Sequence, residues 1–299
     1  MRITSQAMVQ NSVRRLSTRL AAYDRAQTRL ATGKHILKPS DDPAGANRAL
    51  GLRAARAAHV QAQRNASDAM AWLDVADSQM QAAVDRLQRA RDLATAAASH
   101  IGDAERNAIA EEIDTILHEL LGIANHEHRG RPVFAGHGDG PAVVDDGGVW
   151  RYAGDDGDVV RRVGDQDRVK VNVTAAELFG VDAAGSGGDV FTMLEEMAAQ
   201  LRTPGSDGSV FAAKIAEIDT ALERIVDQQA FIGAQTNWVE SALQRSEDTL
   251  LSLRGELAEV EDTEYAAGIM ELQTQELAYT ATLQALAKAL PPSLLSFLR

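Results

Sequence analysis

Residues 215–260 read "IAEIDTALERIVDQQAFIGAQTNWVESALQRSEDTLLSLRGELAEV", and this stretch decides the fold class. Alternating steps of three and four residues from Ile215 to Val260 visit fourteen positions, and eleven of them hold Ile, Leu or Val. Such a heptad pattern is typical of a coiled-coil helix. Because a single amphipathic helix is marginally stable in water, the pattern also predicts partner helices elsewhere in the chain.

Both ends of the chain carry a shorter pattern of the same kind. The N-terminal stripe consists of Val9, Val13, Leu16, Leu20, Tyr23 and Leu30, and the C-terminal stripe of Tyr265, Ile269, Leu272, Tyr279, Leu283, Leu286 and Leu290. We expect the two terminal helices to pair antiparallel, and the inner patterns at 73–123 and 215–260 to form a second bundle. Pro291-Pro292 follows the last stripe and leaves open where the last helix ends.

The middle of the chain has a different character. Between Arg129 and Gly180, clusters of glycine and aspartate alternate with short β-prone runs such as "VWRYA" and "RVKVNV", a pattern that predicts antiparallel hairpins. The predicted fold class is therefore mainly α, with long antiparallel coiled-coil helices from both termini forming layered bundles and a small inserted antiparallel β domain. The predicted domains are a terminal helical domain (1–40 with 262–299), a helical bundle (41–129 with 185–261) and the β insert (130–184). We expect the bundle to fold without the insert.

The stretch "GKHILKPSDDPAG", residues 33–45, interrupts the first helical pattern. Gly33 suits the left-handed position after a helix, and Asp42-Pro43 suits the N-cap and first position of the next helix. Gly33, Ser40, Asp41, Asp42 and Pro43 are therefore predicted to form a domain joint, in which Ser40 and the two aspartates accept hydrogen bonds from free backbone N–H groups. The alternative is an acid–base pair of Asp41 and Asp42, but adjacent carboxylates rarely point at one site.

Composition argues against several classes of function. A net charge of −13 argues against a nucleic-acid partner, because phosphate binding requires a basic surface. The absence of cysteine excludes disulfides and thiolate chemistry. The opening "MRITSQAMVQ" lacks the apolar core of a cleaved signal peptide, and no apolar run is long enough to span a membrane. We therefore expect neither a signal peptide nor a membrane partner.

No pattern in the chain points to catalysis, a cofactor or a metal. Of the histidines at 118, 126, 128 and 137, His126 and His128 are two residues apart, which places them on different faces of a helix. The run "GDDGD", residues 154–158, lacks the spacing of a calcium loop and predicts a hairpin turn. No nucleophile elbow, P-loop or kinase signature is present. The chain is therefore predicted not to be an enzyme.

The joint and several further motifs resemble the flagellin family. "LATGKHILKPSDDPAGANRAL" is similar to the opening signature of that family. Within the family, "MRIT", "LKPSDDPAG", "RGRPVFAG", "VNVTAAELFG" and the closing "SLLSFLR" resemble the hook-associated proteins of the hook–filament junction. These motifs span nearly the whole chain. Two features depart from the family, namely the approach "ANHEHRGRPVFAG", which is not rich in asparagine as the family's usually is, and the proline-rich "PPSLL".

The resemblance implies a structural protein that is exported unfolded through the flagellar type III apparatus, without a cleaved signal peptide, to the extracellular flagellum. It implies a ring of about eleven copies between the other junction protein and flagellin. It also implies a cytoplasmic export chaperone at the C-terminal helix. The terminal stripes are then the predicted subunit contacts: Val9, Val13, Leu16, Leu20, Leu30, Ile269, Leu272, Leu283, Leu286 and Leu290.

Two other identities stay open at this point. A flagellin, the filament subunit itself, usually lacks the proline that precedes the two acids here. A cytoplasmic coiled-coil scaffold shares the heptads but does not need the glycine-rich insert. Lys34, His35 and Lys38, beside the two acids, are either contacts to a neighbouring subunit or solvated surface charges.

Overall fold

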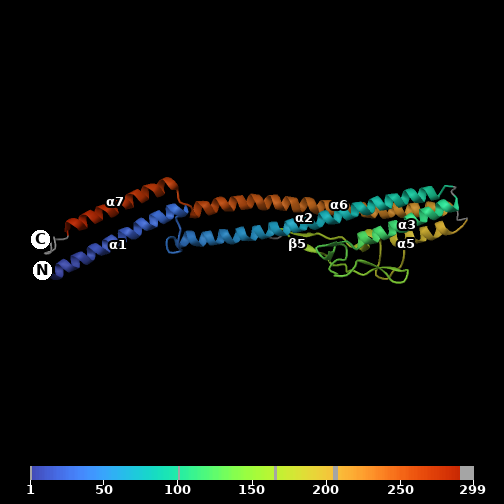
Figure 1. Ribbon diagram of the computed structural model, residues 1–299, viewed down its shortest axis with the longest axis horizontal. Helices are drawn as coiled ribbons and strands as arrows, with labels where there is room; N and C mark the ends of the chain where they lie inside the picture. Colours follow the sequence, from blue (N-terminus) through green and yellow to red (C-terminus); the bar gives the residue numbers. More distant parts are fainter. Residues whose placement is uncertain (1, 100–101, 165–166, 205–207, 290–299) are drawn as a thin grey trace, which may run out of the picture. The chain divides into compact units, whose positions relative to one another are not determined.

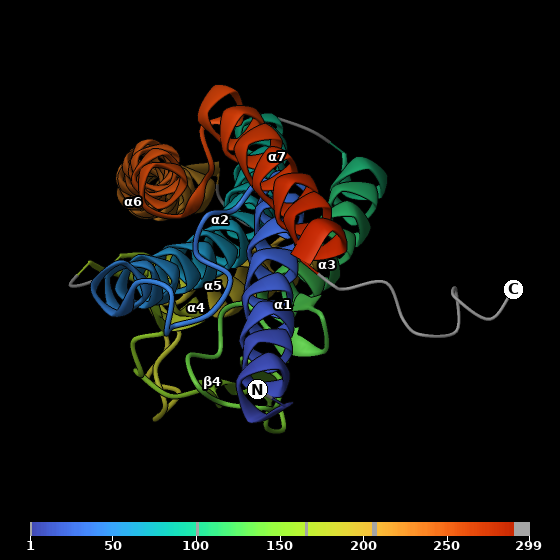
Figure 2. The same cartoon turned by 90° about the vertical axis from the view of Figure 1, so that its left-hand side faces the viewer.

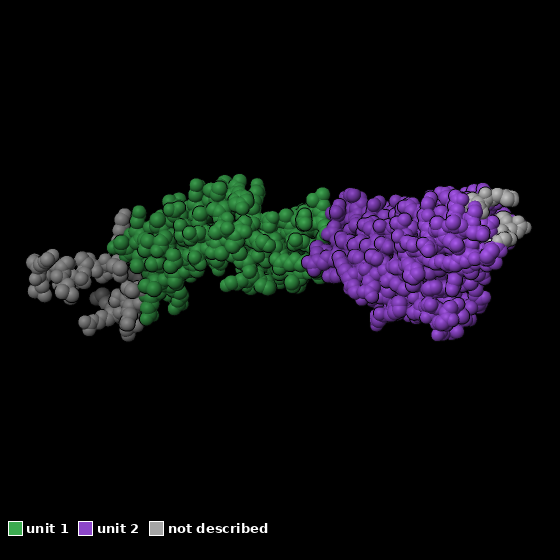
Figure 3. All heavy atoms as spheres, turned by 45° about the vertical axis from the view of Figure 1, so that its right-hand side comes forward, with its two compact units in different colours: residues 1–57, 249–299 green, residues 58–248 purple. Residues whose placement is uncertain are grey.

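The computed structural model describes residues 2–99, 102–164, 167–204 and 208–289 of the chain. The chain divides into two compact units (Figure 3). Unit 1 comprises residues 1–57 and 249–299, and unit 2 comprises residues 58–248. The three-part domain division expected from the sequence stays a prediction.

Long helices account for most of the described residues, which confirms the mainly α fold class (Figure 1). The helices are α1 (Arg2–Thr32), α2 (Pro43–Ala97), α3 (Asp103–Ala124), α4 (Ala175–Phe179), α5 (Val190–Arg202), α6 (Gly208–Glu261) and α7 (Tyr265–Ala289). The strands are β1 (Glu127–His128), β2 (Arg131–Pro132), β3 (Val143–Asp145), β4 (Trp150–Tyr152), β5 (Val160–Arg162) and β6 (Arg168–Lys170).

In unit 1, the terminal helices α1 and α7 lie side by side (Figures 1 and 2). Tyr23 stacks on Tyr279 with 6.4 Å between ring centroids, and Arg29 Nη1 lies 3.8 Å from Glu271 Oε1. The two helices are antiparallel, as predicted, because the residue numbers on α7 fall as those on α1 rise. A Cβ atom at Gly268 would lie 3.3 Å from Leu30 Cδ1, so this glycine allows the two helices to approach closely.

In unit 2, α2 and α6 run antiparallel along a shared hydrophobic core. Arg91 Nε donates to Asp219 Oδ1 at 2.6 Å, and Ser246 Oγ donates to the carbonyl of His59 at 3.4 Å. Buried residues recur along α2 at steps of three and four: Ala66, Ala69, Leu73, Ala76, Met80, Ala83, Leu87, Ala90, Ala94 and Ala97. On α6, the fully buried members of the predicted register are Ile218, Ile225, Ile232 and Val239. The heptad pattern therefore marks the buried face of α6, as expected.

Helices α3 and α5 pack on each other and add to the same core. The predicted stripe on α3 is buried at Ile109, Ile113, Ile116 and Leu120, and α5 buries Phe191, Leu194, Met197 and Leu201. Lys214 of α6, with a side chain only 9% exposed, bridges Glu196 of α5 at 2.7 Å and Glu217 at 2.8 Å. The buried ammonium is thus paired on both sides, as its desolvation requires.

The predicted antiparallel hairpins are present as three two-stranded sheets, β1–β2, β3–β4 and β5–β6. Val143 pairs with Tyr152, and Val160 pairs with Lys170. Side chains of this region, including Phe134, Tyr152 and Val169, belong to the same hydrophobic cluster as α2, α3, α5 and α6. This shared core argues against our expectation that the bundle folds without the insert.

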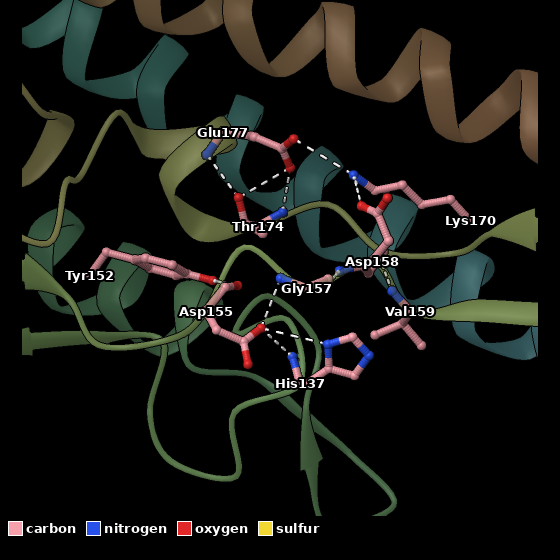
Figure 4. A network of polar contacts seen from close by, with 10 residues as sticks. His137, Tyr152, Asp155, Gly157, Asp158, Val159, Lys170, Thr174 and Glu177 are labelled. Carbon is pink, nitrogen blue, oxygen red and sulfur yellow. Dashed lines mark hydrogen bonds and ion pairs between the residues drawn. The ribbon is translucent and has the colours of Figure 1, made fainter.

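Figure 4 shows the polar contacts that hold the loop between β4 and β5. Asp155 Oδ1 accepts hydrogen bonds from the backbone N–H groups of His137 at 2.7 Å and Gly157 at 2.9 Å, and Tyr152 donates its hydroxyl to the Asp155 carbonyl at 2.7 Å. Those backbone N–H groups lower the pKa of Asp155. Residues 154–158 therefore connect two hairpins, and their prediction as a hairpin turn is wrong because β5 pairs with β6 and not with β4.

Candidate functional site

The joint between α1 and α2 is built by local backbone chemistry. Gly33 follows the last residue of α1 with a φ of 68°, and Pro43 is the first residue of α2. A left-handed φ after a helix favours glycine, and a proline at the first helical position loses no hydrogen bond. The structure thus places both residues at the helix ends where the sequence located them.

The two aspartates of the joint face different backbone N–H groups. Asp42 Oδ1 accepts from Ala44 at 3.1 Å and Gly45 at 3.0 Å, so it caps α2. Asp41 Oδ2 accepts from Lys38 at 3.0 Å and Leu37 at 3.2 Å, and the N–H of Lys38 is the main cause of its lowered pKa. The two carboxylates are therefore no acid–base pair.

Two further residues of the joint differ in their roles. Within the described part of the chain, the Ser40 side chain makes no hydrogen bond, so of the three side chains predicted to accept from backbone N–H groups only the two aspartates do so. Gly45 lies on the first turn of α2, where a Cβ atom would collide with the Asp42 carboxylate and lie 2.7 Å from Ile36 Cδ1. The glycine that ends "DDPAG" therefore leaves room for the capping side chain.

A buried carboxylate connects this joint to the end of α6. Glu261 is 2% exposed, Lys34 Nζ lies 2.5 Å from its Oε2, and Arg53 Nη2 lies 2.6 Å from its Oε1. The backbones also meet, because His35 N–H donates to the Glu261 carbonyl at 2.8 Å and Thr263 N–H donates to the Gly33 carbonyl at 2.7 Å. The α1–α2 and α6–α7 connections are thus joined by two backbone hydrogen bonds and two ion pairs.

Electrostatics keep Glu261 ionised in this buried position. Burial alone raises its pKa, but the hydrogen bonds and charges of Lys34 and Arg53 outweigh burial and leave the pKa below its usual value. Reasoning from the sequence missed this residue, because its partners Lys34 and Arg53 are about two hundred residues away in the chain. One sequence feature could have found it, because Glu261 directly follows the apolar register that ends at Val260.

The predicted contact residues of the terminal helices divide into two sets. Leu16, Leu30, Leu272 and Leu286 are half-buried. Val13, Leu20, Ile269 and Leu283 are 53%, 48%, 45% and 39% exposed. Val9 lies on α1, and Leu290 with Pro291-Pro292 lies outside the described residues.

The four exposed residues lie on one side of the α1–α7 pair. An open groove on the pair is lined by Asn11, Arg14, Arg15, Thr18 and Arg19 of α1 and by Ala281, Thr282 and Ala285 of α7. With 3.6 residues per turn, Val13 and Leu20 flank the half-buried stripe of α1 on the side opposite Arg15. Ile269 and Leu283 likewise lie opposite Ala285 on α7. The side that carries these four residues is called the apolar side below, and the side with the groove the basic side. Exposed apolar residues are not confined to the apolar side, because Met270 and Leu277 of α7 are also exposed and lie near Ala281 around the helix.

Other candidate chemistry finds no support in the described residues. His128 packs edge-on against Trp72, His118 Nδ1 lies 2.7 Å from the Asp114 carbonyl, and His137 lies beside Asp155. Among the residues that the structure describes, no group of three or more His, Asp or Glu side chains could hold a metal ion. In the same residues, no helix combines the length and apolarity needed to cross a membrane.

Comparison with known proteins finds similarity to proteins of the bacterial flagellum. Residues 3–138 match the bacterial flagellin N-terminal helical region. Flagellar hook-associated protein 3 of Escherichia coli is 24% identical over 95% of this chain and 96% of its own length. The chain is therefore similar to the flagellin family over its N-terminal part. The chain also shares its fold with a putative flagellar hook-associated protein from Vibrio parahaemolyticus, with a TM-score of 0.69 at 19% identity over 74% of this chain and all of the other.

Flagellins themselves are also similar to this chain. Flagellin of Bacillus subtilis is 23% identical over the full length of both chains. The relatives are named as parts of the flagellum and not as enzymes, which confirms the prediction that this chain is not an enzyme.

Proposed function

We propose that this chain is a structural subunit of the bacterial flagellum at the junction between hook and filament. The observation that carries the proposal is its similarity, over nearly the whole length, to a flagellar hook-associated protein 3. The chain would act outside the cell, and its work would be mechanical, because a junction must transmit torque between two different polymers without dissociating.

The apolar side of the α1–α7 pair supports a role in assembly. Val13, Leu20, Ile269 and Leu283 are large apolar residues that stay exposed on one side of a helix pair. Fully burying such a side chain contributes about 1.5–3 kcal/mol, so covering all four would supply substantial binding energy. We assign the subunit contacts to this side, while Leu16, Leu30, Leu272 and Leu286 hold the pair itself together.

The binding partners that the resemblance to hook-associated proteins implies are part of the same proposal. Copies would form a ring of about eleven, with the other junction protein on one side and flagellin on the other. The chain would leave the cell unfolded through the flagellar export apparatus, with a chaperone on α7 before export. An apolar side that is exposed on α7 is the kind of surface that a chaperone covers.

A role as the filament subunit is the alternative, favoured by the full-length similarity to a flagellin. A filament subunit would polymerise along the whole filament, whereas a junction protein would stop at its base.

Localisation on isolated flagella tests the proposal. We would express the chain with an epitope tag in the loop around Gly147, whose added Cβ would meet no atom within 4 Å. The host would be its source bacterium without the chromosomal copy. Immunogold label confined to the hook–filament boundary is the expected result, with restored swimming. Label along the whole filament would favour the flagellin alternative, and label absent from flagella would refute both.

A further inference from the structure

The basic side of the α1–α7 pair stands out in an acidic chain. Residues 1–57 hold eleven Lys and Arg against three Asp, although the whole chain has a net charge of −13. Arg14, Arg15 and Arg19 are exposed and line the open groove between α1 and α7. These arginines make no ion pair with any described residue.

The floor of this groove suits a helix as its occupant. Ala281, Thr282 and Ala285 of α7 line it opposite the arginines, and their small side chains leave space for another backbone to approach. Arg14 and Arg19 are five positions apart on α1, which corresponds to roughly 7–8 Å along the helix axis, and Arg15 lies between them. An acidic segment of one to two helical turns would match this length.

Unit 1 carries such an acidic segment at the connection between α6 and α7. Residues 256–264 include Glu256, Glu259, Asp262 and Glu264, with no Lys or Arg among them. Glu259, Asp262 and Glu264 are exposed and Glu256 is half-exposed, and these four form no ion pair with the described residues. Glu261, in contrast, is turned inward to Lys34 and Arg53.

The two charged surfaces cannot meet within one copy. Asp262 and Thr263 lie against Gly33 and Lys34 at the end of α1. Arg19 and Arg14 lie about 21 and 28 Å from Gly33 along α1, at 1.5 Å per residue. The complementary charges are therefore available only to a contact between two molecules.

We propose that the basic groove of one copy binds the acidic α6–α7 connection, residues 256–264, of a second copy of this chain. This inference rests on the proposed function, because it names the partner of the assembling terminal helices. The contact joins two different surfaces, so it is heterologous and extends from copy to copy until it closes into a ring or continues as a helix. Attraction between exposed charges is screened by salt, so high ionic strength should weaken it.

Cross-linking tests the contact directly, because the natural chain has no cysteine. Thr18→Cys lies in the groove and Ala258→Cys lies on the exposed part of the acidic segment. Flagella isolated from cells that express the double variant would be treated with a short bis-maleimide. We expect dimers and larger cross-linked species on a denaturing gel, while each single-cysteine variant and the pair Thr18→Cys with Ser241→Cys give no such ladder.

Reversing the charges of the two surfaces is a second test of the proposed contact. Arg14→Glu, Arg15→Glu and Arg19→Glu together should reduce incorporation into flagella at least tenfold, with unchanged helical content of the purified chain because the three side chains are exposed. Adding Glu256→Lys, Glu259→Lys and Glu264→Lys to the same chain should restore incorporation into flagella. If the natural chain enters flagella but the double-cysteine variant gives only monomer, this inference is overturned and the proposed function stands. If the natural chain is absent from flagella, the proposed function itself fails.

Discussion

Lys34 Nζ lies 2.5 Å from the buried carboxylate of Glu261, although the two residues are 227 positions apart in the chain. Arg53 of α2 pairs with the other oxygen of the same carboxylate. Through these two ion pairs, the Glu261 side chain links the connection between α1 and α2 to the connection between α6 and α7. Two backbone hydrogen bonds, from His35 to the Glu261 carbonyl and from Thr263 to the Gly33 carbonyl, join the same connections.

Removing the charge of Glu261 should loosen the joint. We expect Glu261→Gln to lower the free energy of unfolding by about 1–2 kcal/mol, because hydrogen bonds to charged groups contribute this much and Lys34 and Arg53 are partly exposed. Hydrogen exchange at the His35 and Thr263 amides would report the change locally. Asp262→Asn, at an exposed neighbouring acid, is the matched control and should leave both amides protected. Equal effects of the two variants would contradict the assignment.

Lowering the pH should loosen the joint in the same way as Glu261→Gln. The pKa of Glu261 is lower in the folded chain than its ordinary value of 4.5, so its contribution is complete above that value and is lost as the pH falls through the folded pKa. We therefore expect the difference in melting temperature between the natural chain and Glu261→Gln to be constant near neutral pH and to shrink below about pH 4.5. A difference that grows on acidification would show that the carboxylate is not held ionised.

Glycine substitutions in α2 should have opposite signs at two neighbouring positions. At Gly45 a methyl group collides with the capping Asp42, so Gly45→Ala should destabilise by about 1 kcal/mol through loss of the cap. At Gly51 a methyl group meets no atom within 4 Å, so Gly51→Ala should stabilise by about 0.5–1 kcal/mol, the usual gain of alanine over glycine in a helix. Thermal melts of the two variants decide this, and two shifts of the same sign would be inconsistent with the packing at Gly45.

A charge on the exposed apolar side of the terminal helices should block assembly without affecting folding. Leu283→Asp and Ile269→Asp place a carboxylate on the exposed apolar side and should block incorporation into flagella with little change in the melting temperature. In an assembled interface the same charge would be desolvated without a partner, at several kcal/mol. Ile232→Asp, in the core of unit 2, should unfold the free chain. If Leu283→Asp destabilised the free chain as much as Ile232→Asp, the exposed side would not be reserved for partners.

The hairpin region, by which we mean the predicted insert of residues 130–184 including α4, should be required for the stability of unit 2. Phe179 is fully buried and its ring lies 5.4 Å from that of Phe191 on α5, so Phe179→Ala should destabilise unit 2 by about 3–5 kcal/mol. Val160→Ala, at an exposed position on β5, is the control and should change the stability by less than about 0.5 kcal/mol. Denaturant unfolding measures both. A small effect of Phe179→Ala would mean that the helices hold their core without the hairpin region.

Much of the fold could be predicted because it rests on interactions between near neighbours in sequence. The cap of α2 at Asp42 and Pro43, the left-handed Gly33 and the heptads of α6 all involve residues within about one or two turns of each other. Spacing alone therefore identified the long helices, the two helix ends at Gly33 and Pro43 and the antiparallel order of the terminal pair.

Only the tertiary structure decided what each apolar residue faces. The stripe predicted on α7 contained both Leu283 and Leu286, but the rotation of α7 against α1 half-buries Leu286 with Thr282 and leaves Leu283 exposed. Adjacent residues on a helix are about 100° apart, so a modest rotation exchanges one stripe for the next without any change in the pattern. The pairing of Glu261 with Lys34 and Arg53 is likewise invisible to spacing. It exists because two chain segments more than two hundred residues apart are brought together, and the free energy of that contact depends on burial that the local sequence does not encode.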